Sequence, residues 1–430
     1  MTSENTEQLT EFRVEKITQG SIAGRNDMAD DVKQTSFPAY QSDVKGQGRT
    51  FRVEFVRSNS SSANATNRMT LVAAFKIENV PVLVGDLLIT DEPGDTTHNF
   101  LPTRPDLSQT KPTERRRSGA RRKVLILGGK LILGFTGSIY AGSILFKDLH
   151  RRFSETSPSP DELNFALRLF NIQLSGSASV VGWLADPEPR CFIWTAGANS
   201  QLRWVTHAIL GTGADHFSKV ILSANSRSYS ESLAPIELAR FVAITKATSV
   251  LANELSAAGT LQNNYGYGLE VATWNGEIFE FQNSLTCIFF NALIGPGDRN
   301  QLQPVFVRMY KRFDRFSIVQ SIYMQDTVGP DGSVGRQIFV DFVTSLHDDC
   351  NDIAFPKSAI DPHASIYCFG IAWKEIDSNK NGFLNLTTDE SAVEIQGEGK
   401  KFNFQLRDSG MLISTIREFV SSAQRSKTQD

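Results

Sequence analysis

Cysteine is scarce in this chain. Only four occur in 430 residues, and each lies in or beside an apolar run, far from the others: Cys191, Cys287, Cys350 and Cys368. This number and spacing exclude a small domain held together by disulfides. They indicate buried free thiols, which favours a reducing, cytoplasmic location.

An excess of charge of one sign is also absent. The chain has 44 basic and 47 acidic residues, so it has no overall field that would attract nucleic acid or an anionic membrane. No apolar run approaches the length that spans a membrane, and the N-terminus lacks the basic-then-apolar pattern of a signal peptide. We therefore expect a cytoplasmic protein with no nucleic-acid partner and no membrane association.

Two long polar stretches contain few core-forming residues. Residues 1–69 include a Ser/Asn-rich part from Ser58 to Asn67, and we expect a flexible N-terminal extension or pro-segment. The insert from Asp91 to Arg122 contains four prolines and ends in an arginine-rich run. It favours a solvated loop, with the alternative of a basic rim that steers acidic peptides or contacts a partner.

Two apolar hairpins flank this insert. The first has strands over 71–77 and 82–84, joined by the polar turn Glu78-Asn79-Val80-Pro81. The second has strands over 124–127 and 131–133, joined at Gly128-Gly129. Four residues mark the edges of the hairpins: Thr70 before the first strand, Asp86 after the second, Lys123 before the third and Gly137 after the fourth.

This arrangement resembles the start of a proteasome β-subunit, and equally that of the peptidase subunit of the bacterial ATP-dependent proteasome-like protease. Thr70 and Asp86 keep the sixteen-residue spacing of that family, and Ala74-Phe75-Lys76 matches a triplet that many β-subunits carry. Further along, the stretch 209–214 resembles the family's Gly-Ser-Gly turn, with Thr212 in the place of the serine. The resemblance covers roughly residues 70–290.

The resemblance implies a role for each of these residues. Thr70 is the nucleophile and its own α-amine the base, because a free α-amine has a reference pKa near neutrality. Lys123 and Asp86 are the pair that tunes it, and the backbone N–H at Gly137 stabilises the oxyanion. Thr212 is a supporting hydroxyl. No cofactor and no metal is implied.

Two departures from the family pattern leave the function open. Met69 stands before Thr70 where the family usually has Gly, so either the chain is cut there or translation begins at Met69. Asn263 or Asn264 stands where the family has a later Asp and Ser. The first function is a threonine-type peptidase or amidase that cleaves peptide bonds through an N-terminal Thr. The alternative is a catalytically inactive subunit that acts as a scaffold or binding module.

The rest of the chain predicts alternating strands and helices. Helical spacing is found over 144–153, 216–222 and 235–255, and a further helix begins after Ser159, whose N-cap position precedes Pro160, Asp161 and Glu162. Periodicity alone indicates an α+β protein. The resemblance implies a four-layer αββα sandwich of the N-terminal nucleophile hydrolase type over residues 70–290.

Residues 291–430 lie beyond the family core. Strand-like runs over 305–310, 317–323, 336–343 and 365–373 predict a β-rich accessory region. The stretch 377–382 resembles half of a calcium loop, but position 388 is Thr rather than Glu, which favours a plain turn. As partners the resemblance implies a protein or peptide substrate, further copies of the chain in a homo-oligomer, and an ATP-dependent unfoldase.

Overall fold

The computed structural model describes most of the chain from residue 70 onward. The described ranges are 70–91, 116–173, 178–197, 200–223, 234–257, 265–295, 300–328, 334–348, 363–376, 381–389, 393–396, 403–407, 413–414 and 416–417. The predicted extension 1–69 therefore lies outside the described residues, except for its boundary at Thr70. Within these ranges, no helix has both the length and the apolar character needed to span a bilayer.

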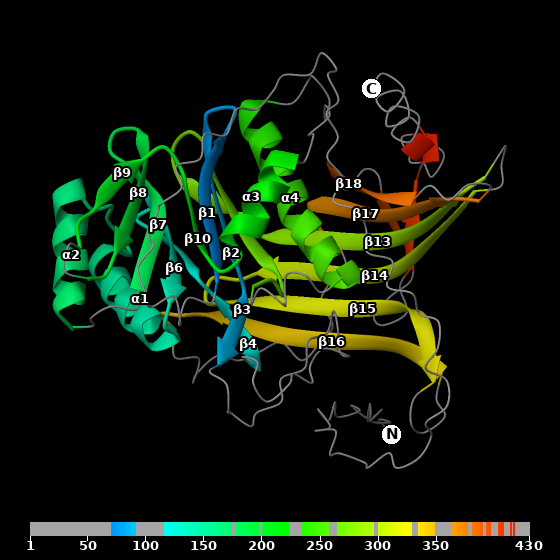
Figure 1. Cartoon of the computed structure of the whole chain (residues 1–430), viewed down its shortest axis with the longest axis horizontal. Coiled ribbons are helices and arrows are strands. Elements are labelled where there is room, and N and C mark those ends of the chain that lie inside the picture. The colour runs from blue at the N-terminus through cyan, green and yellow to red at the C-terminus, as the bar shows by residue number, and fades with distance from the viewer. Residues whose placement is uncertain are drawn as a thin grey trace, which may run out of the picture. The chain divides into compact units, whose positions relative to one another are not determined.

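Two five-stranded sheets face each other through a shared core (Figure 1). The first has the order β10-β1-β2-β11-β12. Its strands are Ala208–Gly211, Leu71–Ile77, Val80–Asp86, Leu269–Trp274 and Phe279–Phe281. The second sheet has the order β5-β6-β7-β8-β9. Its strands are Val124–Leu127, Leu131–Gly137, Ala178–Ala185, Pro189–Thr195 and Arg203–Val205. Both predicted hairpins are confirmed, as β1–β2 and β5–β6.

Each of these sheets carries a pair of helices on its other face. Helices α1 (Ile139–Phe153) and α2 (Pro160–Gln173) pack on the second sheet, while α3 (Ala214–Ser223) and α4 (Pro235–Ala257) pack on the first. The predicted start of α2 is confirmed. The Ser159 Oγ donates to Glu162, whose own N–H donates back to Ser159, which satisfies the open donors of the first turn.

A third, larger sheet of eight strands has the order β18-β17-β13-β14-β15-β16-β4-β3 (Figure 1). It covers α4 on the side away from the first sheet, and one core contains side chains from both sheets and from α4. Because α4 is covered on two sides, it is apolar around most of its circumference. The strands in that order are Asn381–Asp389, Ile366–Glu375, Ser284–Ile294, Gln301–Arg312, Phe316–Val328, Val334–Ser345, Arg116–Arg122 and Leu88–Asp91.

The predicted four-layer αββα sandwich is wrong as a description of this chain. The described residues form twenty strands and only four helices, and the eight-stranded sheet is a layer that such a sandwich does not contain. The individual strands over 305–310, 317–323, 336–343 and 365–373 are confirmed as parts of β14 to β17. Of these strands, β16 pairs with β4, some two hundred residues earlier, and strand periodicity carries no signal for such a non-local pairing.

Two further boundaries differ from the sequence pattern. The arginine-rich end of the 91–122 insert was predicted as a solvated loop, and this is wrong because β4 pairs with β3 and β16. The boundary predicted after residue 290 falls inside β13, which pairs with both β14 and β17. The short strands β19 (Val393–Gln396) and β20 (Asn403–Leu406) form a separate pair.

Candidate active site

The chain crosses between sheets at two neighbouring points, and the predicted site residues lie there. After Asp86 the chain leaves the first sheet and enters the eight-stranded sheet as β3. After Arg122 it leaves the eight-stranded sheet as β4 and enters the second five-stranded sheet as β5. Asp86 is the last residue of β2, and Lys123 lies between β4 and β5. Both residues therefore lie where the chain passes from one sheet to another.

Asp86 and Lys123 form a buried ion pair. The Lys123 Nζ lies 2.8 Å from the Asp86 Oδ1 and also donates to the Leu88 carbonyl. The same Oδ1 accepts the Leu71 N–H at 2.9 Å, and the Asp86 Oδ2 accepts the Gly266 N–H at 3.1 Å. The carboxylate therefore joins the lysine to the backbone of the residue that follows Thr70.

Burial dominates the electrostatics of this pair. It raises the pKa of Asp86 above its ordinary value, although Lys123 and the Leu71 and Gly266 N–H groups act in the opposite direction. Burial likewise lowers the pKa of Lys123, against the attraction of Asp86. The 2.8 Å contact between the two groups favours the charged form of each against this cost of burial.

Thr70 lies at the head of β1 and is 2% exposed. Its neighbour Leu71 pairs with Gly211 of β10, where the backbone has a φ of +101°. A Cβ at Gly211 would lie 1.6 Å from the Thr70 carbonyl oxygen, so only glycine fits. In the full chain Met69 precedes Thr70, so the Thr70 nitrogen is an amide until that bond is cut.

Both glycines of the turn 211–213 pack closely against residues of the site. A Cβ at Gly213 would lie 2.6 Å from the ring of Tyr265, which is fully buried and hydrogen-bonds to the His216 Nδ1. Thr212, between the glycines, is exposed to solvent. The turn thus brings the backbone of Thr70 and the ring of Tyr265 into close packing, with the predicted supporting hydroxyl of Thr212 on its outer side.

Gly137 lies at the end of β6, in the second five-stranded sheet. It pairs with Ala178 and has a φ of +134°. Two residues earlier on the same strand, the Phe135 N–H donates to the Lys123 carbonyl at 3.1 Å. Strand β6 is therefore hydrogen-bonded directly to the backbone of Lys123. The described pairing of Gly137 itself is with Ala178 of β7.

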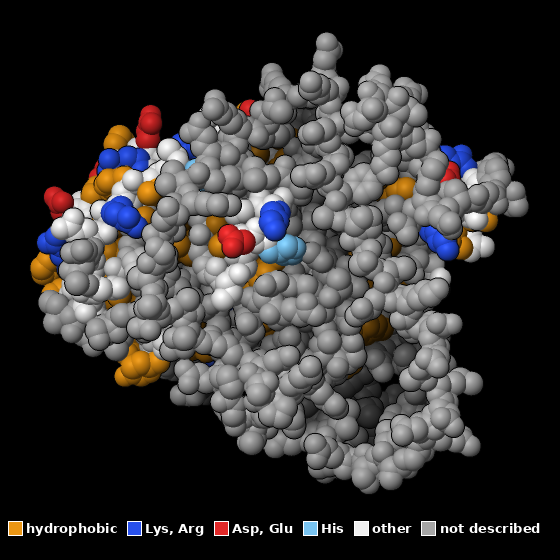
Figure 2. Space-filling view, viewed as in Figure 1, with side chains coloured by type: hydrophobic (Ala, Val, Ile, Leu, Met, Phe, Trp, Pro, Cys, Tyr) orange, Lys and Arg blue, Asp and Glu red, His pale blue; other side chains and the backbone are white. Residues whose placement is uncertain are grey.

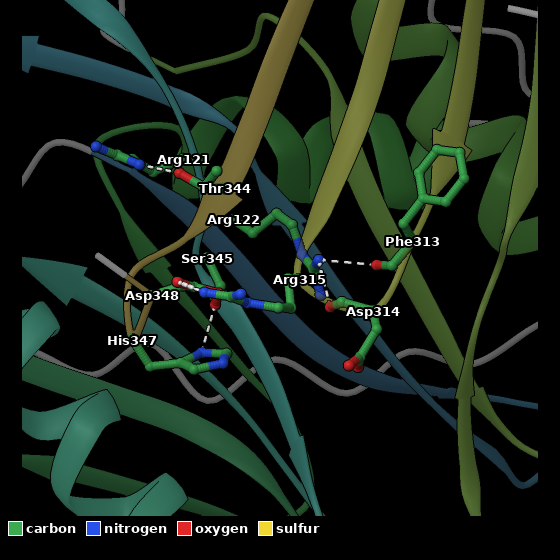
Figure 3. Close-up of polar contacts among 9 residues, drawn as sticks. All are labelled: Arg121, Arg122, Phe313, Asp314, Arg315, Thr344, Ser345, His347 and Asp348. Carbon is green, nitrogen blue, oxygen red and sulfur yellow. Dashed lines mark hydrogen bonds and ion pairs between the residues drawn. The ribbon is translucent and has the colours of Figure 1, made fainter. Parts of the chain in front are cut away.

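A second buried ionic cluster lies beside the first. Arg122, the residue before Lys123, approaches Glu270 at 3.2 Å, and Arg312 contacts the same carboxylate. The Arg122 Nη1 also donates to the carbonyls of Phe313 and Asp314, at 3.1 and 2.9 Å (Figure 3). These bonds tie the end of β4 to the β14–β15 turn and to β11.

Helix α3 carries three titratable side chains, Asp215, His216 and Lys219. On the face that Figure 2 shows, acidic, basic and histidine side chains lie close together near the centre. Burial lowers the pKa of His216, and Lys219 acts in the same direction. No group of three or more metal-ligating side chains occurs within the described ranges.

No protein-family model matches the chain, and no curated protein sequence matches it significantly.

Sequence reasoning missed several residues that shape the site. Arg122 was read as part of a solvated run, although it directly precedes the buried Lys123 and is itself 3% exposed. Tyr265 and Gly266 were also missed, and the alternation Tyr-Gly-Tyr-Gly over 265–268 was the signal that a special backbone conformation was needed. The proposed stand-ins Asn263 and Asn264 lie outside the described residues.

Proposed function

We propose that this chain is a threonine-type amide hydrolase that becomes active when Thr70 is exposed as an N-terminal residue. One observation carries the proposal. A single buried carboxylate, Asp86, accepts both the Lys123 ammonium and the Leu71 N–H, and so links a cation to the backbone beside the Thr70 hydroxyl. A threonine hydroxyl at its ordinary pKa is a poor nucleophile and needs an adjacent base, which a free α-amine can supply.

The chemistry follows the two steps of acyl transfer. The freed Thr70 amine takes the hydroxyl proton as the oxygen attacks the carbonyl carbon of a peptide bond, and the proton passes to the leaving amine. Water then hydrolyses the ester and restores the hydroxyl. Lys123 disfavours protonation of the neighbouring amine through its charge, and Asp86 holds Lys123 in place. The Gly137 N–H is the proposed donor to the tetrahedral oxyanion.

The test compares variants of the nucleophile in the chain that begins at Thr70. Thr70→Ala is expected to abolish peptide hydrolysis, and Thr70→Ser to retain measurable hydrolysis because a hydroxyl remains. Thr206→Ala is the matched control, since it removes an exposed threonine hydroxyl that the proposed mechanism does not use. Hydrolysis by the Thr70→Ala chain at the rate of the starting chain would remove Thr70 from the mechanism.

The second candidate function is a catalytically inactive scaffold or binding module. The observation that favours it is that Thr70 is buried and joined to Met69 by a peptide bond in the full chain. Under this proposal the purified protein keeps residues 1–69, and Thr70 is not labelled by an electrophile that reacts with N-terminal threonine. Intact mass measurement separates the two functions before any substrate is known.

The proposed setting is the cytoplasm, with protein or peptide substrates, assembly of several copies and delivery by an ATP-dependent unfoldase. Reduced thiols support the location. Cys287 and Cys368 are register partners on adjacent parallel strands, and both are free and buried. The size of the native assembly in solution and cell fractionation test these parts of the proposal.

A further inference from the structure

The segment Tyr265–Gly268 has an unusual backbone and lies directly against Asp86. Gly266, Tyr267 and Gly268 have φ values of +122°, +67° and +153°. A tyrosine in the left-handed region is uncommon and persists only where its surroundings hold it there. The Gly266 N–H donates to Asp86, while the carbonyls of Gly266 and Gly268 accept the N–H groups of Leu88 and Leu87 at 3.2 and 3.0 Å.

Three charged residues from three different elements hold Tyr267. The Tyr267 N–H donates to the Glu254 Oε2 of α4 at 2.7 Å, and its carbonyl accepts the Arg308 Nη1 of β14 at 2.5 Å. Its hydroxyl donates to Asp341 of β16. Glu254 and Arg308 are both fully buried. Backbone donor, backbone acceptor and side-chain donor of one strained residue are thus each bound by an ionisable group.

Arg308 makes two further contacts that fix its own orientation. Its Nε donates to the Ser321 Oγ at 3.2 Å, and its guanidinium carbon lies 5.3 Å from the centre of the Tyr267 ring. Taking a guanidinium and a carboxylate out of water is costly, and a well-packed apolar pair of similar volume often stabilises a fold as well. Stability alone therefore gives a weak reason for this arrangement.

We propose that Glu254, Arg308 and Asp341 are positioning residues, which hold Tyr267 in its left-handed conformation and thereby keep the Gly266 N–H on Asp86. This inference rests on the function proposed above for the Asp86 site. It gives the eight-stranded sheet a direct part in that function, because Arg308 and Asp341 belong to two of its strands. Losing the Gly266 donor raises the pKa of Asp86 further, since that N–H now acts to lower it.

The test replaces Glu254 and follows Gly266 and the pH profile together in the purified protein, which the proposed function expects to begin at Thr70. Glu254→Met removes the acceptor of the Tyr267 N–H, and Glu254→Gln keeps an oxygen there as the conservative rescue. We expect the Gly266 amide hydrogen to exchange about tenfold faster in Glu254→Met. We expect the acidic limb of the pH profile of hydrolysis to move up by about half a pH unit, and the rate to fall about tenfold. Glu254→Gln is expected to restore most of each.

Ile371→Val is the control for a general loss of stability, because Ile371 is buried in the core of the same sheet away from this network. Where Glu254→Met does not fold, Tyr267→Phe gives the same test with a smaller effect, since it removes only the bond to Asp341. The proposal is overturned if the Gly266 amide hydrogen of Glu254→Met exchanges no faster than that of the control. It is also overturned if that hydrogen exchanges faster but the pH profile of hydrolysis of an active chain does not move. If the starting chain has no Thr70 activity, the proposed function fails, and Gly266 exchange alone still decides the positioning role.

Discussion

Arg122 and Lys123 are adjacent in the sequence and both buried, yet their surroundings differ. The Lys123 partner, Asp86, has both carboxylate oxygens occupied by the lysine and by two backbone N–H groups. Around Arg122, two arginines share Glu270, the Arg122 Nε approaches that carboxylate at 3.2 Å, and the Glu270 Oε2 has no hydrogen-bond partner among the described residues. Both oxygens of the Asp86 carboxylate are therefore bound, whereas one oxygen of the Glu270 carboxylate is not.

The difference indicates different roles for the two centres. The Asp86–Lys123 pair is arranged around the backbone beside Thr70, where a tuned cation has a chemical use. The Arg122 cluster binds backbone carbonyls of the β14–β15 turn and joins β4 to β11, which is a structural use. Each of the following changes tests whether this contrast holds.

The largest expected effect follows removal of Lys123. Lys123→Met leaves the Asp86 carboxylate buried without its cation, and we expect a loss of about 3–5 kcal/mol in the free energy of unfolding. The double variant Asp86→Asn/Lys123→Met should recover part of this loss, because no charge is then left unpaired. Urea unfolding of both variants measures the difference. A single variant as stable as the starting chain would mean that the pair is not buried as described.

Glu270→Gln should lower the free energy of unfolding through the Arg122 cluster, with a smaller effect on the Asp86–Lys123 pair. Two buried arginines then lose their shared anion, and we expect a loss of about 3 kcal/mol. The rate of hydrolysis by folded protein should change less than in Lys123→Met, because Glu270 acts on Lys123 through its charge but makes no direct contact with Asp86 among the described interactions. Arg312→Met added to Glu270→Gln should restore stability. A rate loss as large as that of Lys123→Met would erase the contrast between the centres.

The free energy of unfolding should also depend on pH through a third feature near Arg122, the ring of His347. The His347 ring stacks on His150 with centroids 4.4 Å apart, and its Nδ1 lies 2.6 Å from the Ser345 Oγ (Figure 3). Burial, followed by the charges of His150 and Arg122, lowers the pKa of His347 to about 4. The folded state thus favours the neutral ring, and the stability it contributes is present above pH 6.5 and lost as the pH falls toward 4.

We expect that loss to be about 1–2 kcal/mol after allowing for solvent screening of a partly buried group. His347→Gln should flatten the dependence between pH 6.5 and 4. Equal slopes for the starting chain and His347→Gln would contradict the assignment.

The smallest effect is expected at the edge of the same region. Arg315 makes a two-point contact with Asp348, at 2.6 and 2.7 Å, and the two side chains are 44% and 8% exposed. Arg315→Gln should lower stability by about 1 kcal/mol, since the arginine is largely in water and Arg122 also attracts the Asp348 carboxylate. Thermal unfolding at low and high salt checks this. A loss comparable to that of Glu270→Gln would show that burial does not separate the centres.

The sequence was informative about local elements and about one contact of the site. The hairpin β1–β2 and the capped start of α2 follow from turn residues and a capping box, which act over a few positions. The resemblance to the proteasome β-subunit family implied that Asp86 and Lys123 act as a pair, and the Lys123 Nζ lies 2.8 Å from the Asp86 Oδ1. Their catalytic role stays a prediction.

What the sequence did not predict depends on contacts between distant residues. The run 116–122 has the composition of a loop and becomes a strand only because β3 and β16 pair with it. Tyr267 has no local reason for a left-handed backbone, since Glu254, Arg308 and Asp341 supply it from other elements. Pattern reasoning follows one element at a time, so it predicted strands of the third sheet but missed how they pair and which of their residues hold the site.

The central claim is that Asp86 and Lys123 serve a hydroxyl whose own amine has been freed. The most direct measurement treats purified protein with an electrophile specific for N-terminal threonine and then maps the adduct by peptide mass. The account predicts a chain that begins at Thr70, with one adduct on that residue and none in the Lys123→Met variant. A chain that retains residues 1–69 and carries no adduct at Thr70 would contradict it.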